Sequence, residues 1–155
     1  MGNIRLCVRK FGESIGVGII SGLAGTAAIT VSQMIEMKIT KRQGSNAPAK
    51  AVHEALNIKA DEGKEKKFVQ EIHWVYGTMW GVARGLLTIA GIKRWTATTA
   101  HFAAVLGTAM IIEPVLKAAP PIKKWSTKEI LIDAMHHAVY AIAAGIIYDA
   151  ITCKE

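Results

Sequence analysis

Four stretches of mainly apolar residues, separated by polar connections, dominate the chain. The first stretch, 15–35, contains 21 residues without a charge. The other three run over 69–92, 96–116 and 130–151 and carry few charged residues. A helix needs ~20 such residues to cross the ~30 Å hydrocarbon core of a bilayer. The pattern therefore predicts an all-α fold, a four-helix transmembrane bundle with helices at about 15–37, 67–92, 96–116 and 127–151.

A water-soluble four-helix bundle is the alternative fold for such a pattern. Helices of soluble bundles carry charge along one face over their whole length. No face is charged between Ser14 and Glu36, and none between Phe102 and Ile112. The pattern favours a single integral membrane domain over 1–155, with the lipid bilayer as its partner. Within the first connection, 49–58 is expected to form a short amphipathic surface helix.

Residues at the span ends and along the spans support the helices. Ser126 and Glu129 have the spacing of a capping box, and Pro120-Pro121 interrupts the chain just before it. Small residues recur every four positions within three of the spans, which lets helix backbones approach closely in lipid. These helix-packing residues are Gly18, Gly22, Gly77, Gly81, Gly85 and Gly145.

The net charge of +7 comes from basic residues that flank the spans. Twelve of the 19 lie in the first and third connections, six lie in the two tails and the second connection, and Arg84 lies inside a span. The positive-inside rule then places the two larger connections in the cytoplasm, with both termini on the other side of a prokaryotic inner membrane. The basic N-terminal tail favours the opposite orientation. This distribution gives no reason to expect nucleic-acid binding.

Two short patterns occur twice, in the same order. Residues 73–81 and 137–145 both fit H-x-V-Y-small-x-x-x-G, and residues 25–29 and 107–111 both fit G-T-A-x-I. The order predicts a 2+2 internal repeat of parallel type, with a pseudo-twofold axis along the membrane normal. Chance similarity between apolar helices is the alternative.

The H-x-V-Y-G-x-x-x-G pattern and the Pro120-Pro121 turn before His136-His137 resemble the uncharacterised YagU-like inner-membrane proteins of bacteria. The likeness covers mainly the second to fourth spans. It implies a small multi-pass protein of the inner membrane. It implies no substrate, cofactor or catalytic residue.

Ionisable side chains gather in two layers across the predicted bundle. The layer beside the two larger connections holds carboxylates and imidazoles at span ends: Glu36, His73, Glu113, Asp133, His136 and His137. In the other layer, Arg84 and Asp149 fall at nearly the same depth and are predicted to form an ion pair, and His101 opens the third span there. An ionisable group in hydrocarbon is costly, so each is expected to have a partner or a task.

Three interpretations of the Glu/His layer remain open from the sequence. The residues either stabilise the bundle near the interface, or handle protons or a cation, or bind a transition metal or haem. Asp133-x-x-His136 has metal-ligand spacing on one helix face, and His73 with His137 would supply two axial haem ligands. In the first two interpretations the protein is not an enzyme; the third includes a redox enzyme.

Other sequence features leave further alternatives. The small-residue faces would suit a homo-oligomer or an accessory subunit of a larger membrane complex. Ser21 and Ser32 lack the G-x-S-x-G context of a hydrolase nucleophile. Cys7 and Cys153 lie outside the spans as free, lipidated or paired thiols.

Overall fold

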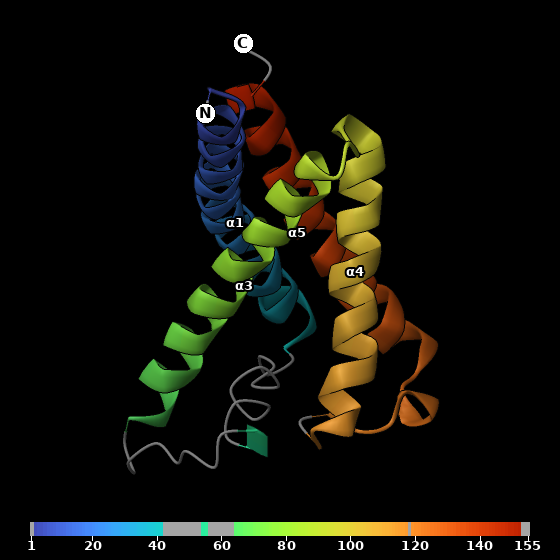
Figure 1. The fold of residues 1–155 in the computed structure, drawn as a ribbon. Helices are drawn as coiled ribbons and strands as arrows, with labels where there is room; N and C mark the ends of the chain where they lie inside the picture. Colours follow the sequence, from blue (N-terminus) through green and yellow to red (C-terminus); the bar gives the residue numbers. More distant parts are fainter. Residues whose placement is uncertain (1, 42–53, 56–63, 118, 153–155) are drawn as a thin grey trace.

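The computed structural model describes residues 2–41, 54–55, 64–117 and 119–152 and shows four long helices. They are α1 (Gly2–Thr40), α3 (Glu65–Ile89), α4 (Arg94–Val115) and α5 (Thr127–Thr152), with the short 3₁₀ helix η1 (Ile122–Lys124) before α5. Successive long helices run in opposite directions, so the two ends of the chain lie at the same end of the bundle (Figure 1). No strand occurs in these ranges, and the all-helical prediction is confirmed.

Three of the four long helices are apolar enough to cross a membrane: the stretch Val8–Thr40 of α1, all of α4 and all of α5. The sequence predicted four such spans. The remaining helix, α3, the second predicted span, does form, but its composition alone does not qualify it as a span, because His73 and Arg84 lower the mean hydropathy of its most apolar stretch.

The outer faces of these helices are apolar and exposed. Ile39 on α1, Ile111 on α4 and Leu131 on α5 are examples, with 76%, 64% and 64% of their surface exposed. Patches of exposed aliphatic side chains on every long helix are typical of a surface that faces lipid. Together with the three long apolar helices, they indicate a membrane-embedded protein.

Helix boundaries differ from the prediction mainly in α1. This helix begins at Gly2 rather than near Ile15, and its 39 residues span roughly 58 Å, about twice a hydrocarbon core. Its polar first turns are helical too, and an Arg9–Glu13 ion pair at 3.5 Å joins neighbouring turns there. The second predicted helix, 67–92, also ends earlier than expected. As α3 it stops at Ile89, because Gly91 adopts a φ of +87°, which favours glycine.

The capping box that opens α5 is formed as predicted. The backbone N–H of Glu129 donates to Ser126 Oγ at 3.2 Å, and the backbone N–H of Ser126 donates to Glu129 Oε2 at 2.7 Å. Both donors at the start of the helix are satisfied in this way. The surface helix expected over 49–58 lies outside the described residues, except Glu54 and Ala55, which are helical.

The closest helix contact joins α1 to α3 and is made of glycines. A Cβ on Gly22 would lie 2.5 Å from the carbonyl oxygen of Thr78, and one on Gly18 would lie 2.6 Å from that of Gly81. Because both neighbours are backbone atoms, no larger residue fits without moving a helix. On the other side of the bundle, Gly145 of α5 packs in the same way against the Thr98 side chain of α4.

The middle of the bundle is filled by one tyrosine and its neighbours. Tyr140 of α5 is buried with Ile29, Val105 and Ala141, while Trp80 and Phe102 pack against this cluster.

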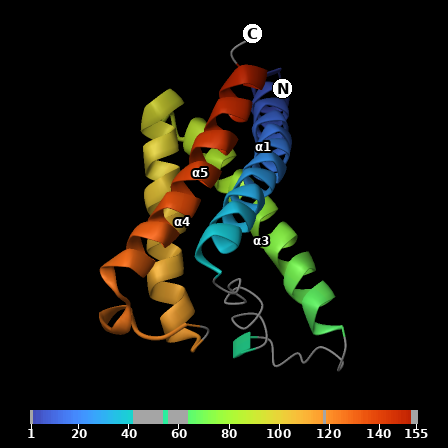
Figure 2. The same ribbon diagram turned by 180° about the vertical axis from the view of Figure 1, so that it is seen from behind.

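The directions of the four long helices are those that a parallel 2+2 repeat would have. Any up-and-down four-helix bundle has the same directions, so they do not test the repeat (Figure 2).

Candidate functional site: buried histidines and a buried arginine

His136 of α5 lies between a hydroxyl and a carboxylate of α1. Its Nδ1 is 2.8 Å from Ser32 Oγ, and its Nε2 is 3.9 Å from Glu36 Oε2. Ser32 and Glu36 are one helical turn apart, so they present both groups to the same ring. His136 is 2% exposed and Glu36 is 7% exposed, which places this group inside the bundle.

The Glu36 carboxylate also reaches the end of its helix. Thr40, in the last turn of α1, shares its one hydroxyl proton between Glu36 Oε1 at 2.8 Å and the backbone carbonyl oxygen of Glu36 at 3.0 Å. Thr40 is exposed. A line of polar groups, Ser32, His136, Glu36 and Thr40, therefore runs from the interior to the surface at the end of α1.

His73 contacts a different part of α1. Its Nε2 is 3.0 Å from Thr30 Oγ1, whose hydroxyl donates to the carbonyl oxygen of Thr26 at 2.7 Å. Since the Thr30 proton is used in that bond, His73 Nε2–H is the donor to Thr30. The bond ties α3 to α1 through a single side chain on each.

His137 bonds within its own helix. Its Nδ1–H donates to the carbonyl oxygen of Asp133 at 2.8 Å, and Asp133 Oδ2 is 3.5 Å from the same nitrogen. Glu113 of α4 is the remaining member of the layer, and its carboxylate lies near enough to that of Asp133 for the two negative charges to repel each other. The six residues of the layer are thus divided between an α1–α5 group, an α1–α3 bond and an α4–α5 group.

This division bears on the metal and haem interpretations. In the part of the chain that the structure describes, no three His, Cys, Asp or Glu side chains are grouped as metal ligands. Asp133 and His136 share a spacing, but Asp133 is paired with His137 while His136 faces α1. His73 is bonded to Thr30 through Nε2, whereas His137 is bonded to its own helix through Nδ1, which leaves its Nε2 outside that bond.

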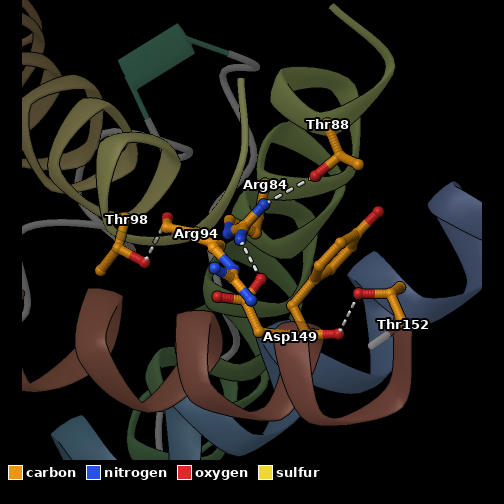
Figure 3. A network of polar contacts seen from close by, with 7 residues as sticks. Arg84, Thr88, Arg94, Thr98, Asp149 and Thr152 are labelled. Atoms are coloured by element: carbon orange, nitrogen blue, oxygen red, sulfur yellow. Dashed lines mark hydrogen bonds and ion pairs between the residues drawn. The ribbon is translucent and has the colours of Figure 1, made fainter. Parts of the chain in front are cut away.

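The structure brings Arg84 and Asp149 together, as the sequence predicts. Arg84 Nη2 is 2.6 Å from Asp149 Oδ1, and Nη1 donates to Thr88 Oγ1 at 2.8 Å (Figure 3). The guanidinium carbon lies 4.4 Å from the centre of the Tyr148 ring. Arg84 is fully buried, so this charge is held by one carboxylate, one hydroxyl and one aromatic face.

His101, the third polar residue on that side, is also fully buried. Its Nε2–H donates to the carbonyl oxygen of Trp80 at 2.9 Å, and its ring meets the Tyr140 ring edge-on at 5.6 Å. The bond joins α4 to α3 one turn from Arg84. It leaves Nδ1 without a hydrogen-bond partner among the described residues.

Tyr140 connects more helices than any residue that sequence reasoning selected. Its hydroxyl donates to the carbonyl oxygen of Gly77 on α3 at 2.5 Å, and its ring lies against Gly25 of α1. The signal in the sequence is its place in the repeated H-x-V-Y pattern. Ser32 and Thr30 carried no such signal, because a hydroxyl in a helix ordinarily bonds to its own backbone.

Comparison with known proteins adds no relative: no family model, no curated protein and no solved structure matches the chain.

Proposed function

We propose that the chain is a four-span protein of a prokaryotic inner membrane, related to the YagU-like proteins, in which α3 is the fourth span. The contacts of α3 support its insertion. Its two most costly side chains are paired with neighbouring helices, Arg84 with Asp149 of α5 and His73 with Thr30 of α1. A helix that is too polar to enter hydrocarbon alone can enter as part of a bundle that pairs its polar groups.

Within that bundle, the proposed function is transfer of protons, or of a small cation, through the group Ser32, His136 and Glu36. The observation that carries it is a buried imidazole with a hydroxyl at 2.8 Å on one ring nitrogen and a carboxylate at 3.9 Å beyond the other. Histidine is the side chain that ordinarily gains and loses a proton at physiological pH. A bonded imidazole can accept a proton at one nitrogen and release one from the other.

The path would run along the line of polar groups to the end of α1. Glu36 takes up the proton from His136 Nε2 and is linked through Thr40 to the surface. Since 3.9 Å exceeds hydrogen-bond length, this step requires the two groups to approach by roughly 1 Å or a water to lie between them. Ser32 Oγ, 2.8 Å from Nδ1, is the group through which the ring would regain a proton at its other nitrogen.

Proton flux into vesicles tests the proposal. The full chain is reconstituted with a pH-sensitive dye inside, and a potassium diffusion potential is applied with valinomycin. We expect His136→Gln and Glu36→Gln each to lower the flux on the order of tenfold or more, because the relay loses its titrating group. His137→Gln is the matched control: it alters the adjacent histidine, which bonds to its own helix.

Two results would overturn this function. One is wild-type flux equal to that of empty vesicles, with sodium and potassium fluxes also at that level. The other is equal flux in His136→Gln, Glu36→Gln and His137→Gln. A cation flux that only His136→Gln and Glu36→Gln abolish would identify the cation, rather than the proton, as what the group transfers.

A further inference from the structure

The start of α1 continues past the end of the helix that packs against it most closely. A Cβ on Gly85 of α3 would meet the carbonyl oxygen of Ser14. The two helices are antiparallel, so α3 reaches its last residue, Ile89, where α1 has only reached about Lys10. Every side chain that the structure describes over 4–13 is exposed. The described helices therefore leave this stretch of α1 uncovered.

The uncovered stretch is amphipathic. Ile4, Val8 and Phe11 follow one another at the helical spacings i, i+4 and i+7, so they share one face. Their side chains are 72%, 66% and 52% exposed, although all three are apolar. Arg9 and Lys10 lie on the remaining circumference of the helix and are exposed too. An apolar stripe with basic residues beside it is typical of a helix that lies on a membrane surface.

This stretch begins at the level of the headgroups. The connection from α3 to α4 lies at the same end of the bundle as the N-terminus (Figure 1). There Lys93 and Arg94 are exposed, and Trp95 is 66% exposed. Basic and indole side chains at the end of a span are typical of the membrane–water interface. The apolar stripe thus lies beside a lipid surface.

We propose that residues 4–11 of α1 form an interfacial helix that binds anionic phospholipid headgroups on the side of the membrane where α1 begins. The apolar stripe enters the boundary between headgroups and acyl chains, and the basic side chains contact the phosphates. The charge of the stretch fits this partner: residues 2–14 contain three basic residues and one acid, Glu13, which is paired with Arg9. The inference is independent of proton transfer.

A bend at the edge of the bundle would bring the stripe onto the surface. Gly12 lies at this edge, and a Cβ there would meet nothing within 4 Å. No packing contact holds α1 straight at Gly12, and a glycine in a helix lowers the cost of bending it. A straight continuation into water would instead leave the apolar stripe hydrated.

Spin labels on the two sides of the stretch test the proposal. The full chain with Cys7→Ser and Cys153→Ser carries one nitroxide, at Ile4→Cys or Val8→Cys on the apolar stripe, or at Leu6→Cys on the opposite side. It is reconstituted in vesicles of phosphatidylcholine, with or without phosphatidylglycerol. With phosphatidylglycerol, the ratio of oxygen to nickel–chelate accessibility should be on the order of threefold higher at positions 4 and 8 than at position 6. Phosphatidylcholine alone should reduce this excess.

Removal of charge tests the contact with phosphate. Arg9→Gln combined with Lys10→Gln should lower the excess at position 4 by about half or more, because two basic side chains no longer attract the headgroups. Lys38→Gln combined with Lys41→Gln is the matched control. It removes two exposed charges from the other end of α1 and should leave the excess unchanged.

Four results would overturn the proposal. Equal accessibility ratios at positions 4, 6 and 8 with phosphatidylglycerol would place the whole stretch in water. An equal excess in phosphatidylcholine alone, or an equal effect of the two charge-removing pairs, would show that anionic headgroups are not recognised here. Protection of positions 4 and 8 from both reagents, with dipolar broadening between labelled chains, would identify a second copy of the chain as the partner.

Discussion

At the scale of single residues, the strongest demand on this fold is the full burial of Arg84. Its charge is balanced by Asp149 at 2.6 Å, whose side chain is 31% exposed, so the arginine is the more deeply buried partner. Removing one partner of a buried pair typically costs ~3–5 kcal/mol, because the other is left uncompensated. Arg84→Ala and Asp149→Ala should each lower the melting temperature of the purified protein, and the double variant should lose less than the two effects summed.

Arg9→Ala is the control for that cycle. The Arg9–Glu13 pair is exposed on both sides, so its removal should change the melting temperature little. Strict additivity of the Arg84 and Asp149 effects would mean that the two charges do not stabilise each other.

The sequence predicts which polar side chains lie at the same depth in the bundle. It predicts their pairing only where depth alone decides which side chains meet. Arg84 and Asp149 are costly charges at one depth, so their pairing follows from the cost of burial. Rotation about the helix axis is what the sequence does not determine. His136 and His137 are neighbours at nearly the same depth, yet one faces α1 and the other bonds to its own helix. Which of them meets Glu36 depends on how α5 packs against α1.

At the scale of the helices, the contact between α1 and α3 is set by glycines that leave no room for a methyl group. A Cβ on Gly22 would lie 2.5 Å from Thr78 O and 2.9 Å from Gly81 Cα, both of them backbone atoms. Gly22→Ala should therefore destabilise the protein by about 1–3 kcal/mol, as overpacking of a close contact does. A melting curve in detergent measures the loss.

Gly16→Ala provides the matched comparison on the same helix. A Cβ there meets nothing within 4 Å, and alanine favours the helix, so stability should stay the same or rise by up to ~1 kcal/mol. Equal losses in Gly16→Ala and Gly22→Ala would show that helix propensity, rather than the contact with α3, sets the effect.

The helices themselves were largely predictable, for physical reasons that vary along the chain. The start of α5 follows from Ser126 and Glu129, since a capping box fixes a helix end by local bonds. The start of α1 was missed because hydropathy reports the length of an apolar run, while helix formation continues through polar residues as far as Gly2.

At the scale of the whole molecule, the number of membrane crossings depends on α3 alone. Three helices are apolar enough to span, and α3 carries the buried Arg84 and the half-buried His73. If α3 crosses, Lys41 and Lys93, which flank it, lie on opposite sides of the membrane. If it does not, they lie on the same side. The four-span topology thus makes a prediction that a three-span topology contradicts.

Thiol labelling in intact cells distinguishes the two topologies. Single cysteines replace Lys41, Lys93 or Lys123, all exposed, in a chain with Cys7→Ser and Cys153→Ser. With the two larger connections in the cytoplasm, a membrane-impermeant maleimide should label Lys93→Cys from outside. It should label Lys41→Cys and Lys123→Cys only after permeabilisation. Reversal of all three would invert the orientation but keep four spans, because α3 and α4 would still separate the sites. Labelling of positions 41 and 93 from the same side would show that α3 does not cross, and the pairing of Arg84 with Asp149 would then have to form outside hydrocarbon.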